Sequence, residues 1–173
     1  MNRHSYLQVA GFLDNSLVNG KGLRSVLFVS GCYHNCKNCQ NKEMQSIYYG
    51  DKVNVDDVLN RIKNNLPLIK GVTFSGGEPF EQAENLALLG GKLKKLNLDL
   101  WCYSGYTFEY IKDNMHNKKG WKDLIQSIDV LIDGKYEEKN NIKGLKYRGS
   151  SNQRIIDVKE TLEKGKVVCL KYF

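Results

Sequence analysis

The sequence predicts an α/β fold built around a mostly parallel sheet. Short apolar runs rich in β-branched and aromatic residues alternate with amphipathic segments at βα spacing, and no internal repeat is evident. Connections of this kind join parallel strands. The first buried run leads directly into a loop with three cysteines, at the sheet edge where α/β proteins bind ligands. From the length of 173 residues we expect one domain, 1–173.

The first third of the chain predicts two strands and a helix. Scattered apolar side chains in residues 1–17 predict a short strand or hairpin at an edge, and Ser25–Ser30 (SVLFVS) predicts a buried parallel strand. Asn54 is typical of a helix N-cap. The apolar residues after it fall on one helical face before Pro67 ends the helix: Val55, Val58, Leu59, Ile62 and Leu66.

The rest of the chain continues the alternation. The predicted strands are Gly71–Ser75, Leu98–Tyr103, Ile128–Ile132, Arg154–Val158 and Lys166–Tyr172. The predicted helices run from Phe80 to about Leu96, from a cap at Thr107 through Met115, around Trp121, and as a short turn near Glu160–Glu163. The polar segment Lys135–Lys146 predicts a mobile loop.

Composition indicates a soluble cytoplasmic protein. Hydrophobic residues make up 41% and charged residues 26%, and no apolar run approaches the ~20 residues of a membrane helix. The N-terminal stretch lacks the apolar core of a signal peptide, and five cysteines with three clustered argue against a disulfide framework. The net charge of +7 is spread along the chain. It predicts a soluble surface that can also steer an acidic partner, and it indicates no nucleic-acid surface.

The segment Ser30–Asn41 places Cys32, Cys36 and Cys39 at a C-x3-C-x2-C spacing. Three thiolates this close fit either a zinc site or an iron–sulfur cluster. His34 is a conceivable fourth zinc ligand, although it lies inside the same small loop. If the group is a 4Fe–4S cluster, three thiolates leave one iron free to bind a small molecule.

Three further groups of residues are candidates for a site, and each lies at the end or the start of a predicted strand. The turn Ser75, Gly76, Gly77 and Glu78 is either an ordinary strand-to-helix connection or a place where glycines let a ligand approach the backbone. Asp133 is either a turn residue before Gly134 or a polar ligand contact. Arg148 opens the block RGSSNQR and can pair with a carboxylate, or the block can dock a partner. Cys102 and Cys169 lie in predicted strands and are interpreted as buried small hydrophobes.

Several blocks resemble one known family. The cysteine loop resembles that of radical S-adenosylmethionine (SAM) enzymes. The wider set is similar to the activating proteins of anaerobic ribonucleotide reductase: VNGKGLRSVLFVSGC (18–32), TFSGGEPFEQ (73–82), WCYSGYTFE (101–109), IDGKYE (132–137) and YRGSSNQRIIDV (147–158). The resemblance implies an open partial (β/α) barrel of radical SAM type. It also implies a 4Fe–4S cluster on Cys32, Cys36 and Cys39.

The resemblance implies further roles. SAM would bind the open iron and the turn Ser75–Glu78, with contacts to Asp133 and Arg148. Many radical SAM proteins have an aromatic residue before the third cysteine, and here that position is Asn38, so Tyr33 is a candidate replacement. Reductive cleavage of SAM would give a 5′-deoxyadenosyl radical that removes a hydrogen from a glycine in a C-terminal loop of the reductase large subunit. A one-electron donor such as a flavodoxin is implied.

Two other interpretations stay open. One is another radical SAM enzyme, either a different glycyl-radical activase or a deazaguanine-forming type. The more distant one is a basic zinc-binding module for nucleic acid, for which the sequence offers neither a fourth nearby ligand nor a dense basic stripe.

Overall fold

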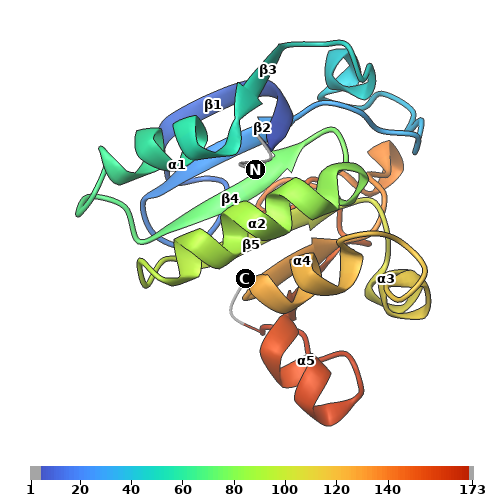
Figure 1. Ribbon diagram of the computed structural model, residues 1–173. Coiled ribbons are helices and arrows are strands. Elements are labelled where there is room, and N and C mark those ends of the chain that lie inside the picture. The colour runs from blue at the N-terminus through green and yellow to red at the C-terminus, as the bar shows by residue number, and fades with distance from the viewer. Residues whose placement is uncertain (1–4, 172–173) are drawn as a thin grey trace.

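A computed structural model describes residues 5–171 and forms them around one seven-stranded sheet in the order β3-β1-β2-β4-β5-β6-β7 (Figure 1). The strands are β1 (Tyr6–Ser16), β2 (Arg24–Val29), β3 (Asp51–Asn54), β4 (Gly71–Gly76), β5 (Asp99–Ser104), β6 (Val130–Asp133) and β7 (Arg154–Asp157). The central strands β2, β4, β5 and β6 are parallel, whereas β1 and β7 run antiparallel to their neighbours. The sheet is not closed, which confirms the predicted open, mostly parallel α/β architecture.

Residues 5–171 also form five α-helices and three short 3-10 helices. They are α1 (Val55–Lys63), α2 (Ala83–Lys94), α3 (Phe108–Asn114), α4 (Trp121–Ser127), α5 (Val158–Lys164), η1 (Lys42–Gln45), η2 (Pro79–Gln82) and η3 (Glu138–Asn140). Figure 1 shows α1, α2 and α4 lying across one face of the sheet. No helix within residues 5–171 is long and apolar enough to cross a membrane.

The main core lies between this helical layer and the sheet. Leu27, Phe74 and Leu100 from the central strands pack with Leu86 of α2 and Leu124 of α4, and all five are fully buried. A smaller cluster covers the opposite face: Trp101, Val130, Ile132 and Ile155, with Tyr103, Tyr147 and Leu170 packed against it. Both faces of the central strands are therefore covered, which explains their nearly continuous apolar sequences.

The predicted helix caps are confirmed at two positions. The Asn54 side chain accepts a hydrogen bond of 2.8 Å from the backbone N–H of Asp56, and Thr107 accepts one of 3.3 Å from Tyr110. These contacts satisfy donors that the first helical turn leaves unpaired. The local sequence therefore sets where α1 and α3 begin.

Three predicted features differ from the structure. Residues 51–54 form β3, an outer strand that the sequence reading missed, so the N-terminal strand β1 is not at the edge. The helix expected from Phe80 begins as the 3-10 helix η2. The expected strand Lys166–Tyr172 is reduced to one bridge between Ile156 and Cys169, and its last residue lies outside the described range.

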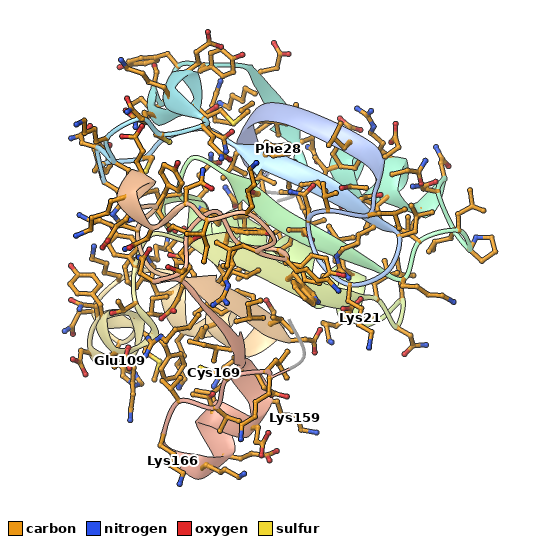
Figure 2. All side chains as sticks on the ribbon, turned by 180° about the vertical axis from the view of Figure 1, so that it is seen from behind. Lys21, Phe28, Glu109, Lys159, Lys166 and Cys169 are labelled. Carbon is orange, nitrogen blue, oxygen red and sulfur yellow. The ribbon has the colours of Figure 1, made fainter. Side chains whose placement is uncertain are left out.

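Cys169 is exposed, so its interpretation as a buried small hydrophobe is wrong, whereas Cys102 is fully buried as predicted. Figure 2 shows Cys169 on the segment that follows α5. Cys169 meets β7 through a single bridge to Ile156.

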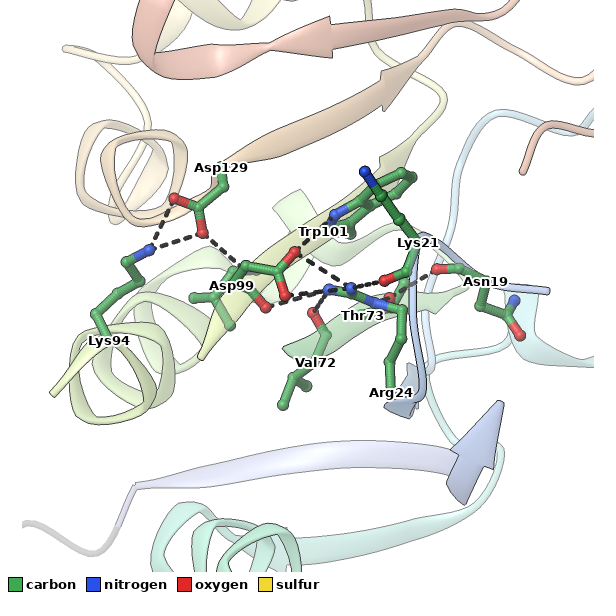
Figure 3. Close-up of polar contacts among 10 residues, drawn as sticks. Asn19, Lys21, Arg24, Val72, Thr73, Lys94, Asp99, Trp101 and Asp129 are labelled. Atoms are coloured by element: carbon green, nitrogen blue, oxygen red, sulfur yellow. Dashed lines mark hydrogen bonds and ion pairs between the residues drawn. The ribbon is translucent and has the colours of Figure 1, made fainter. Parts of the chain in front are cut away.

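A buried polar network fixes the amino-terminal ends of the central strands (Figure 3). Arg24 opens β2 and is fully buried, and its Nε donates to Thr73 Oγ1 at 2.8 Å. Its Nη1 donates to the Asp99 carboxylate at 3.2 Å, and the guanidinium lies 5.2 Å from the ring centroid of Trp101. Burial lowers the pKa of Arg24, and the charge of Asp99 opposes that effect. The network joins β2, β4 and β5 at the edge opposite the cysteine loop.

Candidate functional site

The cysteine loop leaves the carboxyl end of β2 and turns sharply at three positions. Gly31 has φ +95°, and two asparagines, Asn35 and Asn38, have φ +50° and +53°. Asparagine is one of the few side chains that tolerates this left-handed conformation. Each asparagine directly precedes a cysteine, so the two turns present Cys36 and Cys39 toward the same side. Asn38 therefore has a backbone role in the loop.

The three thiols of Cys32, Cys36 and Cys39 are free, partly buried and line one cavity of about 490 Å³. Within residues 5–171, no three Cys, His, Asp or Glu side chains are already converged on a metal position. Burial raises the pKa of the Cys32 thiol to about 11 and also raises that of Cys36. A bound metal needs thiolates, so assembly would release these protons as it draws the sulfurs together. The donor set fits an iron–sulfur cluster.

The turn after β4 forms the second wall of this cavity. Ser75, Gly76 and Gly77 all line it. The backbone N–H of Gly77 ties the turn to the end of β2 by donating to Val29 O at 2.7 Å. Two further bonds tie it to the cysteine loop: Glu78 N donates to Gly31 O at 2.8 Å, and Asn41 Nδ2 donates to Gly76 O at 3.1 Å. The two segments that the sequence singled out are thus neighbours at the carboxyl edge of the sheet.

Glu78 and Asp133 are buried at this edge and already hydrogen-bonded. Glu78 is fully buried and accepts from Phe80 N and Ser104 Oγ among others. Asp133 is 1% exposed, accepts from Phe108 N at 2.7 Å, and forms an ion pair with Arg154. Both carboxylates point into the protein. In this arrangement they shape the edge rather than offer free oxygens to a ligand.

The block that begins at Arg148 folds into a compact turn beside the cavity. Gln153 organises it: its Oε1 accepts from Gly149 N at 2.8 Å and from Ser150 N at 3.1 Å. Arg148 lines the cavity, and its Nη1 donates to Gln153 O at 2.8 Å. Its Nε is buried and has no hydrogen-bond partner among residues 5–171. An unpaired buried N–H of a cation is costly, so this atom is suited to an anionic ligand group.

The segment 135–147 contributes residues that the sequence reading missed. It was predicted as a polar loop, and it is largely irregular, but Tyr136, Ile142 and Tyr147 from it line the cavity. The backbone N–H of Tyr136 donates to the sulfur of Cys36 and opposes the rise of that thiol's pKa. The alternating apolar residues inside the polar stretch were the available signal. Tyr33, in contrast, is 67% exposed and is not among the lining residues of this cavity.

His34 also lies in this site, and the direction in which its imidazole points decides whether its Nε2 is available to a metal. Its Nε2 lies 2.7 Å from Glu78 Oε2, and its ring is nearly buried. This nitrogen is therefore committed to a carboxylate and does not act as a fourth metal ligand. The three thiols remain the sulfur donors of the site.

Comparison with known protein families first shows the class of protein to which this chain belongs. The family described as "4Fe-4S single cluster domain" matches residues 18–156, which include the cysteine loop, the glycine turn and the whole Arg148 block. The chain belongs to this family of iron–sulfur proteins.

The relatives narrow the class to one family. A protein of Vibrio cholerae is 34% identical over 162 residues, covering 90% of this chain and 97% of its own length. One of Pasteurella multocida is 36% identical (83% and 93% coverage), and one of Enterobacteria phage T4 is 35% identical (80% and 86%). All three are named anaerobic ribonucleoside-triphosphate reductase-activating protein. The chain is a member of this family of activating proteins.

A solved structure supports the fold alone. The crystal structure of QueE from Escherichia coli matches with a TM-score of 0.50 at 15% sequence identity. The match covers 59% of this chain and 53% of that one, so this chain spans about half of QueE.

Proposed function

We propose that this chain is a cytoplasmic radical SAM activase that generates the glycyl radical of anaerobic ribonucleoside-triphosphate reductase. The observation that carries the proposal is that the three cysteines, the Gly76–Gly77 turn and Arg148 all line one cavity. Family membership supports the iron–sulfur cofactor and the reductase as partner. The bound cluster, once reduced by a one-electron donor such as a flavodoxin, supplies the electron that cleaves SAM.

Each residue has a defined part in this proposal. Cys32, Cys36 and Cys39 would hold the cluster, and His34, whose Nε2 is turned to Glu78, would not compete with SAM for it. The backbone at Gly76 and Gly77 lies open to the amino acid end of SAM, because neither residue has a side chain to cover it. The buried Nε of Arg148 pairs with the SAM carboxylate.

The remaining predicted residues act less directly. Glu78 and Asp133 keep the site in shape through their buried hydrogen bonds, and Tyr33 lies on the exposed outer side of the loop. The open cavity admits the glycine loop of the reductase as substrate. The protein's contribution is to position the reacting groups and to exclude side reactions.

The test uses protein reconstituted with iron and sulfide in the absence of oxygen. We expect about four irons per chain, a reduced-cluster paramagnetic resonance signal that changes when SAM is added, and a glycyl radical when the reductase is supplied. Replacing Cys36 with Ser should abolish the cluster signal and the radical. Cys102→Ser, at a buried position away from the cavity, should leave both largely intact.

The outcomes separate the alternatives. Bound zinc, or a cluster indifferent to SAM, contradicts the mechanism. SAM cleavage without a radical on the reductase, but with one on another glycyl-radical enzyme, assigns a different activase. Equal iron loss in the Cys36→Ser and Cys102→Ser variants contradicts the ligand assignment.

A further inference from the structure

The imidazole of His34 links two parts of the site that the sequence separates by 44 residues. His34 belongs to the cysteine loop, between Cys32 and Cys36. Its side chain is 8% exposed, and its Nε2 lies 2.7 Å from the carboxylate of Glu78, which is fully buried. Because an ionised carboxylate can only accept, this nitrogen carries the proton of the hydrogen bond.

The carboxylate of Glu78 takes part in four hydrogen bonds, two at each oxygen. Its Oε1 accepts from Phe80 N at 3.0 Å and from Ser104 Oγ at 2.9 Å. Its Oε2 accepts from Gly105 N at 2.8 Å and from His34. Of the other three donors, Ser104 ends β5, Gly105 follows it, and Phe80 lies in η2 directly after the glycine turn. His34 is the only one of these four donors from the cysteine loop.

The His34 ring is also held from the sides. It packs edge-on against Tyr106, with ring centroids 4.4 Å apart. It fills the space beside Gly105 so closely that a β-carbon there would lie 2.4 Å from the His34 Cδ2 atom. The backbone N–H of His34 donates to the sulfur of Cys32. One residue therefore connects a thiol, the glutamate after the glycine turn, and the end of β5.

We propose that His34 is a positioning residue that holds the cysteine loop in register with the Gly76–Gly77 turn. Cys36 and Cys39 are partly exposed and flanked by exposed polar residues, and Asn41 Nδ2, which donates to Gly76 O at 3.1 Å, holds the far end of their side of the loop. The His34–Glu78 hydrogen bond anchors the loop to the sheet. This inference rests on the proposed function, since the register determines how the open iron meets SAM held at the glycine turn.

Three variants test the proposal: His34→Leu removes the hydrogen bond, His34→Gln keeps a donor at similar reach, and His116→Leu is the control. His116 is exposed beyond the end of α3, away from the cavity. The first readout is hydrogen–deuterium exchange of the anaerobically reconstituted proteins, which does not depend on activity. We expect faster exchange in residues 31–41 for His34→Leu alone, with the strands unchanged.

The second readout is a SAM titration monitored by the paramagnetic resonance signal of the reduced cluster. Loss of residues that orient metal ligands typically costs 10–100-fold in affinity or activity. We expect His34→Leu to bind four irons but to need about tenfold more SAM for the same spectral change. His34→Gln should restore most of the affinity, and His116→Leu should match the unmodified protein.

Two results would overturn the inference. Unchanged loop exchange and SAM titration in His34→Leu would show that the hydrogen bond positions nothing. Loss of iron equal to that of Cys36→Ser would assign His34 to holding the cluster rather than to orienting it. Failure of the unmodified protein to respond to SAM is a different result, because it rejects the proposed function while the exchange experiment still reports on the anchor.

Discussion

Gly77 lies where the two walls of the cavity meet, and there is no room for a β-carbon at this position. A β-carbon at this position would lie 2.5 Å from the carbonyl oxygen of Gly31 and 2.7 Å from that of Met44. Both are backbone atoms of the segment that carries the cysteines, so neither moves aside cheaply. The absence of a side chain at residue 77 is therefore what allows the two walls of the cavity to approach each other.

Replacing Gly77 with Ala should destabilise the protein by about 1–3 kcal/mol, the usual cost of forcing an extra methyl group into a packed region. Gly91, which is exposed in α2 and would place a β-carbon in open space, is the matched control. Gly91→Ala should stabilise the protein by about 0.5–1 kcal/mol, because alanine loses less conformational freedom in a helix. Urea unfolding of the metal-free proteins measures both. Effects of the same sign would contradict this account.

At the residue scale, the sequence was sufficient where chemistry lies in local spacing. Cys32, Cys36, Cys39 and the Gly76–Gly77 turn were predicted as site residues, and all of them line the cavity. The partners of the buried groups were not predictable in this way. The contact between His34 and Glu78, or between Arg154 and Asp133, joins residues more than twenty positions apart, and only the folded chain brings them together.

At the scale of elements, the Arg24 network acts on three strands at once. Arg24, Gly71 and Asp99 are aligned across the starts of β2, β4 and β5. Gly71 has no room for a β-carbon, which would lie 2.0 Å from the Asp99 carboxylate. The guanidinium and the carboxylate thus fill the space that a side chain at residue 71 would occupy. The network fixes the three strands at their amino-terminal ends, and the loops of the site follow their carboxyl ends.

Replacing Arg24 with Met should cost about 3 kcal/mol of unfolding free energy, because it removes the buried donor that Asp99, Thr73 Oγ1 and Val72 O share. Arg61→Met is the comparison. Arg61 also pairs with an aspartate, Asp14, but the side chains are 51% and 50% exposed, and such surface pairs contribute about 0–1 kcal/mol. Chemical denaturation of both variants decides the point. A loss at Arg24 no larger than at Arg61 would show that the network is dispensable.

The elements that the sequence predicted share strong local signals. The buried runs that form β2 and β4, and the capped helices α1 and α3, all follow from apolar pattern and cap residues. The sequence did not predict β3 because Asp51–Asn54 is polar and short, and its pairing with β1 joins residues far apart in the chain. The opposite error concerns the C-terminal segment Lys166–Tyr172. Its apolar residues predicted a strand, but it forms only one bridge with β7 within the described residues.

In the molecule as a whole, the two ends of the central strands differ. The Arg24 network fixes their amino-terminal ends, and the cavity lies at their carboxyl ends. Removing the cluster with an iron chelator should therefore have an uneven effect. Binding stabilises the regions that hold the ligand, so exchange should rise in residues 31–45 and 134–153 and stay unchanged around residues 71–74 and 99–101. Hydrogen–deuterium exchange before and after chelation measures this. A uniform rise across the sheet would indicate that the cluster supports the whole fold.

The two outer strands bear on how the protein behaves at high concentration. Exposed strand edges can pair with other chains and start aggregation. β3 has only four residues and presents Asp51 and Lys52, and β7 is shielded where Asp157 N donates to Val168 O and Leu170 N to Ile155 O. Removing residues 168–170 would uncover β7 without touching the cavity. Colloidal stability is thus built into a part of the chain that is remote from the chemistry.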